Sequence, residues 1–386
     1  MTRLAAVAIL TGTTALLLVD RISCFLPTPA VPQNRRATTA VVPGAKTCVD
    51  TRNIPHFATG SASKRRPRPP VRESVLGAMR MAAEGAAANV GKRETMAIEA
   101  SKDVPRGPEG AIKLTYLEIN SWMWEVNGLN LLVDPLFGTL DFGLPDFLFQ
   151  AKKQVLWDSE RVTRELAAAT DVLVITQGID DHCHPDTIQA LAGLLDPSVR
   201  VIAPPSARAV LEEHFPARRI SYLIPGQSTV VSKCGRAVEL RATTGPVLGP
   251  PWQQAENGYI VGSAAADGSN HVPEGGGYLY FEPHLMANEA DLSGLTADVV
   301  IAPVVPQSVA GVYPLVNGGS KALYTARALK ASKVVTMANS KGDFQGPVNS
   351  LVIEGSSLEE FLEMARAEGG VSVVVPEVAK AVSVWP

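Results

Sequence analysis

The stretch from Asp171 to Pro185 constrains the fold of this 386-residue chain more than any other feature. Its unbroken apolar run, Val172 to Ile175, predicts a strand buried on both faces, as in a parallel sheet. In such α/β folds, ligands bind beside the carboxyl ends of the strands. A dense polar cluster follows the run and is the first candidate for metal ligands or a proton-transfer pair. The alternative is a polar loop that caps the next helix. The cluster consists of Asp180, Asp181, His182, Cys183 and His184.

The first 72 residues have the composition of targeting segments. Residues 1–24 combine Arg3 with an apolar run from Leu4 to Val19, which is typical of a secretory signal. Residues 25–72 contain nine basic residues and one acidic residue, with many Pro, Ser, Thr and Ala, as transit peptides do. A signal followed by a transit-like segment starting at Phe25 resembles the bipartite presequence of algal plastids inside extra membranes. We expect a disordered targeting segment and a plastid location, with a secreted protein as the alternative.

The rest of the chain is acidic. Residues 73–386 hold 24 basic and 36 acidic side chains, a net charge of −12, which argues against a nucleic-acid partner. Only Cys183 and Cys234 remain outside the targeting segments, too few for a disulfide framework, and this suits a reducing compartment. Because no GxGxxG or GxxxxGK string occurs, no nucleotide cofactor is expected.

We interpret residues 73–110 as a linker with a short helix and residues 111–386 as one folded domain. Lys113 to Leu117, Ser121 to Val126 and Leu129 to Val133 are predicted strands of an antiparallel meander, with a two-residue hairpin turn at Asn127-Gly128. From residue 159 onward, helix-like and strand-like segments alternate, so the fold class is α/β.

Three further features bear on function: the loop 136–150, the segment 317–320 and His214. The Phe-rich loop 136–150 is interpreted as a lid or a loop folded over the core, and membrane contact through it is the less favoured alternative. Asn317-Gly-Gly-Ser320 is predicted to cap a helix that runs to about Leu329. His214 lies late in a predicted helix, where a cation meets the negative end of the helix dipole, so no chemistry is assigned to it.

Two motifs carry a family resemblance. Leu131-Leu-Val-Asp-Pro135 closes the meander, and Ile175-Thr-Gln-Gly-Ile-Asp-Asp-His182 follows the buried strand. In this order they resemble the metallo-β-lactamase superfamily, most closely its lactonase-like branch, over roughly residues 112–380. The resemblance implies an αββα sandwich with the metal site at one edge of two sheets. It also implies that Asp134 is a buried organiser of the metal-binding loop.

The chain departs from the family's ligand pattern at several positions. The first two His of T-H-x-H-x-D-H are replaced by Gln177 and Ile179, and the family's bridging Asp falls on His284. After the first strand, the family's Gly-His is replaced by Glu118-Ile119. The His expected after the 237–242 strand is absent from Thr243-Thr-Gly, and the His of the last metal motif is absent from Thr336-Met-Ala338.

The remaining set allows one divalent metal ion, zinc, iron or manganese, held by Asp181, His182 and His284. His184 and Asp180 are the candidate catalytic groups for proton transfer. Loss of most ligands favours a binding or scaffold role in the cleft, with a small-molecule ligand or a plastid protein complex as partner. The alternative is a mononuclear metal-dependent hydrolase acting on an ester, lactone, thioester or phosphodiester. A third hypothesis, a cysteine hydrolase built on Cys183, is the weakest because neighbouring side chains in an extended segment point to opposite faces.

Overall fold

The computed structural model describes residues 110–247, 254–265, 276–338 and 341–385. The predicted signal, the transit-like segment and all but the last residue of the predicted linker lie outside these residues. None of the helices described is long and apolar enough to span a bilayer.

The first large sheet is built around the predicted meander. Its order is β19-β1-β2-β3-β5-β6-β7, antiparallel from β19 to β3 and parallel from β3 to β7. Asn127 and Gly128 both have positive φ, 50° and 71°, as a type I′ hairpin turn requires. The strands are β1 (Ile112–Tyr116), β2 (Trp122–Val126), β3 (Leu129–Val133), β5 (Val172–Val174), β6 (Arg200–Ala203), β7 (Ile220–Tyr222) and β19 (Ala381–Trp385).

The second large sheet has the same construction. Its order is β18-β15-β12-β11-β10-β9-β8, antiparallel from β8 to β11 and parallel from β11 to β18. Its strands are β8 (Ser228–Lys233), β9 (Arg236–Thr244), β10 (Asn257–Ala264), β11 (Tyr278–Phe281), β12 (Val299–Pro303), β15 (Lys333–Met337) and β18 (Ser372–Val374).

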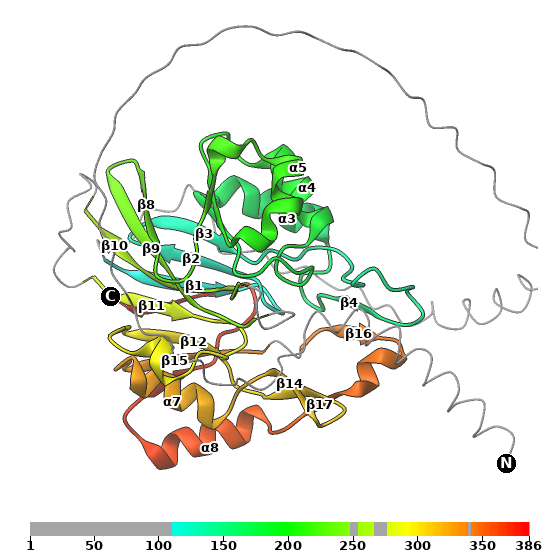
Figure 1. The fold of residues 1–386 in the computed structure, drawn as a ribbon, viewed down its shortest axis with the longest axis vertical. Helices are drawn as coiled ribbons and strands as arrows, with labels where there is room; N and C mark the ends of the chain where they lie inside the picture. The colour runs from blue at the N-terminus through cyan, green and yellow to red at the C-terminus, as the bar shows by residue number, and fades with distance from the viewer. Residues whose placement is uncertain (1–109, 248–253, 266–275, 339–340, 386) are drawn as a thin grey trace, which may run out of the picture. The chain divides into compact units, whose positions relative to one another are not determined.

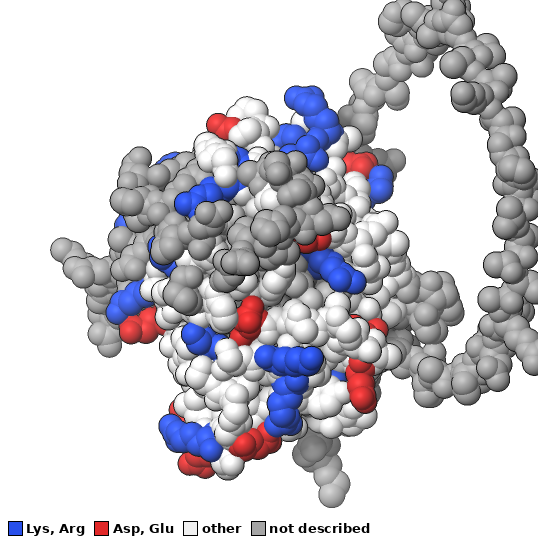
Figure 2. Space-filling view, turned by 90° about the vertical axis from the view of Figure 1, so that its left-hand side faces the viewer, with Lys and Arg blue, Asp and Glu red and all other residues white. Residues whose placement is uncertain are grey.

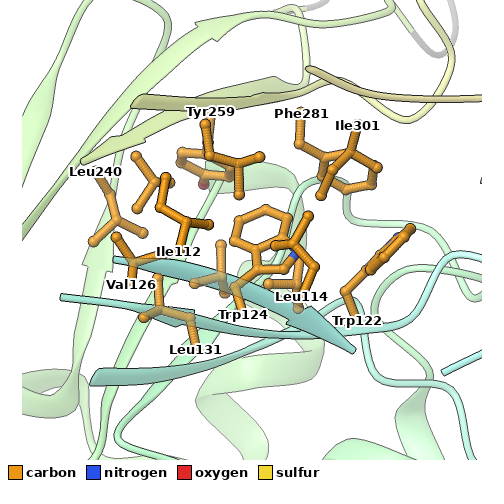
Figure 3. Packing of buried hydrophobic residues seen from close by; sticks show 14 of the residues in the cluster. Ile112, Leu114, Trp122, Trp124, Val126, Leu131, Leu240, Tyr259, Phe281 and Ile301 are labelled. Atoms are coloured by element: carbon orange, nitrogen blue, oxygen red, sulfur yellow. The ribbon is translucent and has the colours of Figure 1, made fainter. Parts of the chain in front are cut away.

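The two sheets pack face to face and helices cover both outer faces (Figure 1). Helices α3 (Ser159–Ala169), α4 (Pro185–Leu194) and α5 (Arg208–His214) cover the first sheet; α6 (Glu289–Leu292), α7 (Ser320–Ala328) and α8 (Leu358–Glu368) cover the second. Between the sheets, Trp124 meets Phe281 edge to face at 5.4 Å between ring centroids (Figure 3). Burial of this shared apolar layer is the main force that holds the sheets together. The predicted αββα sandwich is confirmed.

The Phe-rich loop divides into buried and exposed parts. Phe137 and Phe149 are buried and pack in the core, whereas Phe147 is 74% exposed. The loop leads into β4 (Gln150–Lys152), which pairs with β16 (Asp343–Gln345). A further three-stranded sheet, absent from the sequence prediction, contains β13 (Gln307–Val309), β14 (Tyr313–Val316) and β17 (Val352–Glu354). Short 3-10 turns occupy Pro205–Ala207, Ala217–Arg219 and Pro347–Leu351.

The helix predicted after Asn317-Gly-Gly-Ser320 is present as α7, but no side chain of that segment caps it. The residue before α7 is Gly319, at φ 53°. Asn317 instead donates its main-chain N–H to the carbonyl of His284 and its side-chain amide to the carbonyl of Leu285. The predicted cap therefore positions another loop, the one that carries His284.

Charged side chains do not segregate by sign on the face seen in Figure 2, where basic and acidic groups are interspersed among uncharged ones. This side of the described surface offers no extended patch of a single sign.

Candidate metal centre

Asp134 lies at the end of β3 and anchors the loop that follows β5. Because β3 and β5 are parallel neighbours, their carboxyl ends meet at one edge of the sheet. The Asp134 carboxylate accepts hydrogen bonds from the main-chain N–H of Thr176 at 2.7 Å and from its hydroxyl at 2.5 Å. Its Oδ2 also lies 2.8 Å from Nδ1 of His182. An ionised carboxylate only accepts, so Nδ1 of His182 carries a hydrogen and Nε2 is left to act elsewhere.

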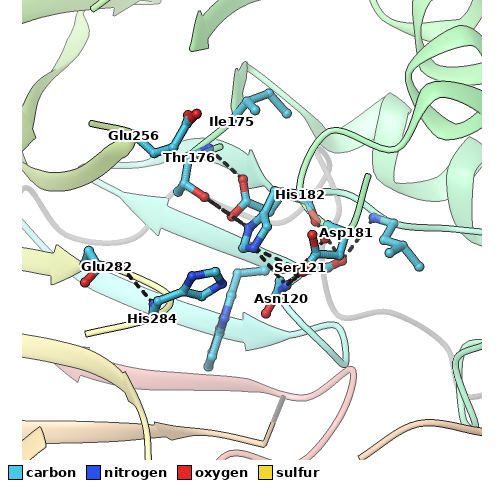
Figure 4. Close-up of polar contacts among 12 residues, drawn as sticks. Asn120, Ser121, Ile175, Thr176, Asp181, His182, Glu256, Glu282 and His284 are labelled. Carbon is cyan, nitrogen blue, oxygen red and sulfur yellow. Dashed lines mark hydrogen bonds and ion pairs between the residues drawn. The ribbon is translucent and has the colours of Figure 1, made fainter. Parts of the chain in front are cut away.

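Three side chains converge beside this anchor (Figure 4). One potential ligand atom from each of Asp181, His182 and His284 lies within 4.8 Å of the other two. Oδ2 of Asp181 is 3.4 Å from Nε2 of His182, and the two imidazole rings are 5.4 Å apart between centroids. The structure thus brings together the three residues predicted as ligands, although His284 is about a hundred residues away from the other two in the chain.

The surroundings favour an ionised Asp181 and a neutral His284 and make His182 a strong base. Burial raises the pKa of Asp181, but the neighbouring imidazoles, His182 first, outweigh it and the net pKa is lowered, so the group is a carboxylate. For His182, burial lowers the pKa, but the carboxylates of Asp181 and Asp134 raise it to about 10, so a metal ion must displace a proton from this ring to bind it at pH 7. For His284, burial and the charge of His182 lower the pKa to about 3, so this ring is neutral at pH 7.

Three side-chain atoms of the triad lack a hydrogen-bond partner among the described residues. Neither ring nitrogen of His284 makes a hydrogen bond there, and Oδ1 of Asp181 is buried without one. Buried polar atoms are rarely left unpaired, and each such exception needs a reason.

The loop that carries His284 is fixed by a buried acid. Glu282 is fully buried at the end of β11, and its carboxylate accepts the main-chain N–H of His284 at 2.9 Å and that of Met286. Burial raises its pKa to about 7, although these hydrogen bonds act in the opposite direction. With Asn317 on the carbonyl side, the loop is held from both directions.

The two predicted proton-transfer residues, Asp180 and His184, flank Asp181 and His182 in the sequence and differ in their contacts. Nδ1 of His184 contacts the hydroxyl of Thr187 at 2.9 Å and caps α4, while Nε2 lies 3.2 Å from the carbonyl of Thr139. The loop therefore caps α4, as the alternative from the sequence expected, but through His184 and not through an Asp side chain. Asp180 is partly exposed, makes no hydrogen bond to a described residue, and has a pKa raised by burial and by Asp181. Their catalytic roles stay predictions.

The positions of the missing family ligands form no second metal cluster within the described residues. Gln177 is completely buried, and both its amide atoms lack a hydrogen-bond partner. Glu256 lies beside this loop, accepting hydrogen bonds from the hydroxyl of Ser206 at 2.5 Å and from the N–H of Gly178 at 3.3 Å. Cys183 packs in the apolar layer under α4, where burial raises the pKa of its thiol, so it is a poor nucleophile.

Sequence reasoning missed Asn120, which the structure places at the triad. Its Nδ2 lies 3.0 Å from Oδ2 of Asp181 and 3.1 Å from Nε2 of His182. A polar residue in the tight turn before β2 was the available signal, but such residues are common in turns.

Comparison with known proteins finds one matching family model and several similar solved structures. A model of the beta-lactamase superfamily domain matches residues 113–338. A search of curated proteins finds no match. Similar solved structures include a metallo hydrolase from Ignicoccus hospitalis (16% identity, 71% of this chain and 98% of that chain, TM-score 0.44). Another is a possible metal-dependent hydrolase from Veillonella parvula (14% identity, 71% of this chain and 100% of that chain, TM-score 0.48). A third is a metallo-beta-lactamase fold protein from Bacillus subtilis (8% identity, 71% of this chain and 100% of that chain, TM-score 0.44).

The family model covers more than half of the chain, and its match includes most strands of both sheets and all three residues of the triad. This chain belongs to the metallo-β-lactamase superfamily.

Proposed function

We propose that this protein binds one divalent metal ion through Asp181, His182 and His284 and is a metal-dependent hydrolase. The observation that carries the proposal is the convergence of these three ligand groups, with His182 oriented by a buried carboxylate. Such carboxylate–histidine pairs fix the ring and raise its basicity at metal sites.

The donor set fits a metal of the zinc type. With metal–ligand bonds of about 2.1 Å, two ligand atoms of a tetrahedral site are about 3.4 Å apart. Oδ2 of Asp181 and Nε2 of His182 have this separation. His284 contributes a neutral ring without a competing partner among the described residues, and Oδ1 of Asp181 is a second unpaired acceptor. Three protein ligands leave at least one position open, as catalytic sites do.

When bound, a divalent metal supplies Lewis acidity and lowers the pKa of water toward neutrality. The protein's own groups do the rest. Asp134 holds the His182 ring in one tautomer, and Glu282 holds the main chain at His284. Asp180 is a partly exposed carboxyl group next to Asp181, and burial and the charge of Asp181 raise its pKa, which favours uptake of a proton. The substrates this arrangement suits are esters, lactones, thioesters or phosphodiesters.

Metal content tests the proposal directly. Protein purified without chelator is expected to hold about one equivalent of zinc, iron or manganese, measured by plasma mass spectrometry, and His284→Ala should lose it. The matched control is His214→Ala, at the last turn of α5 and far along the chain from the triad. Retention of full metal content in His284→Ala would contradict the ligand assignment.

A second experiment tests hydrolysis. The metal-loaded protein would be assayed on 4-nitrophenyl acetate, γ-butyrolactone and bis(4-nitrophenyl) phosphate, with Asp181→Asn as the inactive comparison. Activity on any of the three that disappears in Asp181→Asn supports the proposal. Equal rates in the two proteins would refute a hydrolase acting through this site.

A binding or scaffold role is the second candidate, and one observation favours it. The Asn120 amide contacts both Asp181 and His182, so two of the three candidate ligands have hydrogen-bond partners without a metal. Replacement of two family ligands by Gln177 and Ile179 points the same way. Metal content near zero, at unchanged thermal stability after chelator treatment, would favour this role.

We also propose a plastid location, on the composition of residues 1–72. A fluorescent protein fused behind residues 1–110 should enter plastids of an alga with extra plastid membranes. Export of the fusion from the cell would support the secreted alternative.

A further inference from the structure

We infer that Asn120 is a catalytic residue of the proposed hydrolase, whose amide donates a hydrogen bond to the substrate oxygen that gains negative charge. The inference rests on the proposed function and adds to it the group that contacts the reacting oxygen. The chemical class of ligand is a carbonyl or phosphoryl oxygen held beside the metal ion.

The orientation of the Asn120 amide follows from its neighbours. Nδ2 lies 3.0 Å from Oδ2 of Asp181 and 3.5 Å from the main-chain carbonyl of the same residue (Figure 4). Both atoms are acceptors, so the nitrogen end of the amide faces them. The same nitrogen lies 3.1 Å from Nε2 of His182. Nδ1 of that ring donates to Asp134, so in the neutral ring Nε2 has the lone pair that accepts the second amide hydrogen.

Metal coordination changes this arrangement at one atom. An imidazole nitrogen has a single lone pair, which can accept a hydrogen bond or bind a metal but cannot do both. Oδ2 of Asp181 has two lone pairs and can keep Asn120 while it binds a metal. A metal ion bound at Nε2 would therefore leave one N–H of Asn120 without His182 as an acceptor, while the other could stay on Asp181.

The freed N–H cannot easily turn to solvent, because Asn120 is 5% exposed and its turn is fixed at several points. The main-chain N–H of Leu117 donates to Ser121, that of Ser121 donates back to Glu118, and Ser121 Oγ donates to the carbonyl of Asp134. Glu118 and Ile119 both have positive φ, 65° and 56°. The surrounding contacts must hold this strained pair in place.

Two buried charged residues supply those contacts. The Glu118 carboxylate accepts main-chain N–H groups of Gln154, Val155 and Leu156 at 2.9 to 3.2 Å. Lys153 Nζ donates to the carbonyls of Leu117 and Glu118 and lies 4.6 Å from the centre of the Phe137 ring. The turn therefore keeps the Asn120 amide at the triad whether or not a metal is bound.

A buried donor without an acceptor is costly, so the freed N–H favours an oxygen next to the metal. Its benefit is largest when that oxygen becomes negatively charged. A donor fixed in advance where charge develops stabilises the transition state more than the ground state.

The test compares Asn120→Ala with wild type in the Co²⁺-loaded protein. The d–d absorption of Co²⁺ reports metal binding and, on titration with inorganic phosphate, binding of a tetrahedral oxyanion. We expect Asn120→Ala to bind Co²⁺ as tightly as wild type or more tightly, because a competing hydrogen bond is gone. We expect its phosphate affinity to fall about 10- to 100-fold, the effect of one hydrogen bond to a charged group.

Controls separate this role from a structural one. Asn349→Ala, whose side chain makes no hydrogen bond to a described residue, should match wild type in both titrations. Asn120→Asp keeps the size of the side chain but replaces the donor by a carboxylate, so phosphate binding should be lost while Co²⁺ binds more tightly. Circular dichroism melting curves verify that each variant is folded.

The outcomes are distinct. If wild type binds no Co²⁺, the proposed function itself fails and the role of Asn120 fails with it. If wild type and Asn120→Ala bind Co²⁺ alike and bind phosphate equally well, only the role of Asn120 is overturned. A large loss of Co²⁺ affinity in Asn120→Ala would also overturn it, because the residue would then be supporting the metal ligands.

Discussion

Replacing Asp134 by Asn tests whether the tautomer of His182 determines metal binding. The wild-type carboxylate receives three hydrogen bonds, two from Thr176 and one from Nδ1 of His182. In Asp134→Asn, one oxygen becomes an NH₂ group, which needs acceptors. If the NH₂ group takes the position of Oδ1, it faces the main-chain N–H of Thr176, and two donors meet because that N–H cannot accept a hydrogen bond. If the NH₂ group takes the position of Oδ2, the Thr176 hydroxyl can rotate and the neutral His182 ring can switch tautomer, so that both become acceptors. We expect this second orientation.

The switch moves the hydrogen of His182 from Nδ1 to Nε2, the nitrogen that faces Asp181 at 3.4 Å. A protonated Nε2 cannot bind a metal, and we expect metal affinity to fall by at least about 10- to 100-fold. The free energy of unfolding should fall by less than the loss of all three hydrogen bonds would cause, because each contact is rearranged and none is deleted. A hydrogen bond to a charged group contributes about 1.5–3 kcal/mol, so a total loss of about 2–4 kcal/mol is expected.

Two measurements check the reasoning. Nitrogen-15 chemical shifts of His182 distinguish the tautomers, and titration calorimetry with Zn²⁺ gives the affinity. Metal affinity equal to wild type in Asp134→Asn, or an Nδ1-protonated ring in that variant, would refute the argument.

Three further predictions concern the scaffold that holds the site. Glu118→Ala should lower the free energy of unfolding in urea by about 2–4 kcal/mol, because three main-chain N–H groups lose their acceptor. Burial lowers the pKa of Lys153 to about 7, below its unfolded value of 10.5, so the folded state releases this proton first and wild-type stability should rise from pH 7 toward 10. Lys153 can raise the free energy of unfolding by at most about 1.4 kcal/mol per pH unit in this range. Urea titrations at each pH should show this rise in wild type and not in Lys153→Met. Gly346→Ala should lower the melting temperature far more than Gly294→Ala. Both glycines have positive φ, but only at Gly346 would a Cβ lie 2.3 Å from a main-chain oxygen, whereas nothing lies within 4 Å at Gly294.

The local elements around the site could be predicted from the sequence because their signals are local. The alternation of Trp122 and Trp124 with Met123, the Asn127-Gly128 turn and the apolar run at Val172 define β2, the hairpin and β5. The position of Asp181 and His182 after a buried strand marked them as candidates, and the resemblance to the family's T-H-x-H-x-D-H motif named them as ligands. Each of these features depends on residues within one turn or one strand of each other.

What surrounds the site could not be predicted, because it depends on how distant segments approach. β19 completes the first sheet by pairing with β1, at the opposite end of the described chain. Asn120 was overlooked because its importance lies in two distances, to Asp181 and to His182, that no local pattern encodes. The sequence predicted a proton-transfer role for His184 and assigned the cap to the loop's Asp side chains, and only the contacts with Thr187 show that His184 itself caps the helix.

The sequence by itself determined which side chains could bind a metal and which strand ends would carry them, since side-chain chemistry and strand periodicity are properties of short segments. Only the tertiary structure decided that His284 meets Asp181 and His182, because that meeting depends on two sheets packing face to face and on buried carboxylates holding each loop at the shared edge.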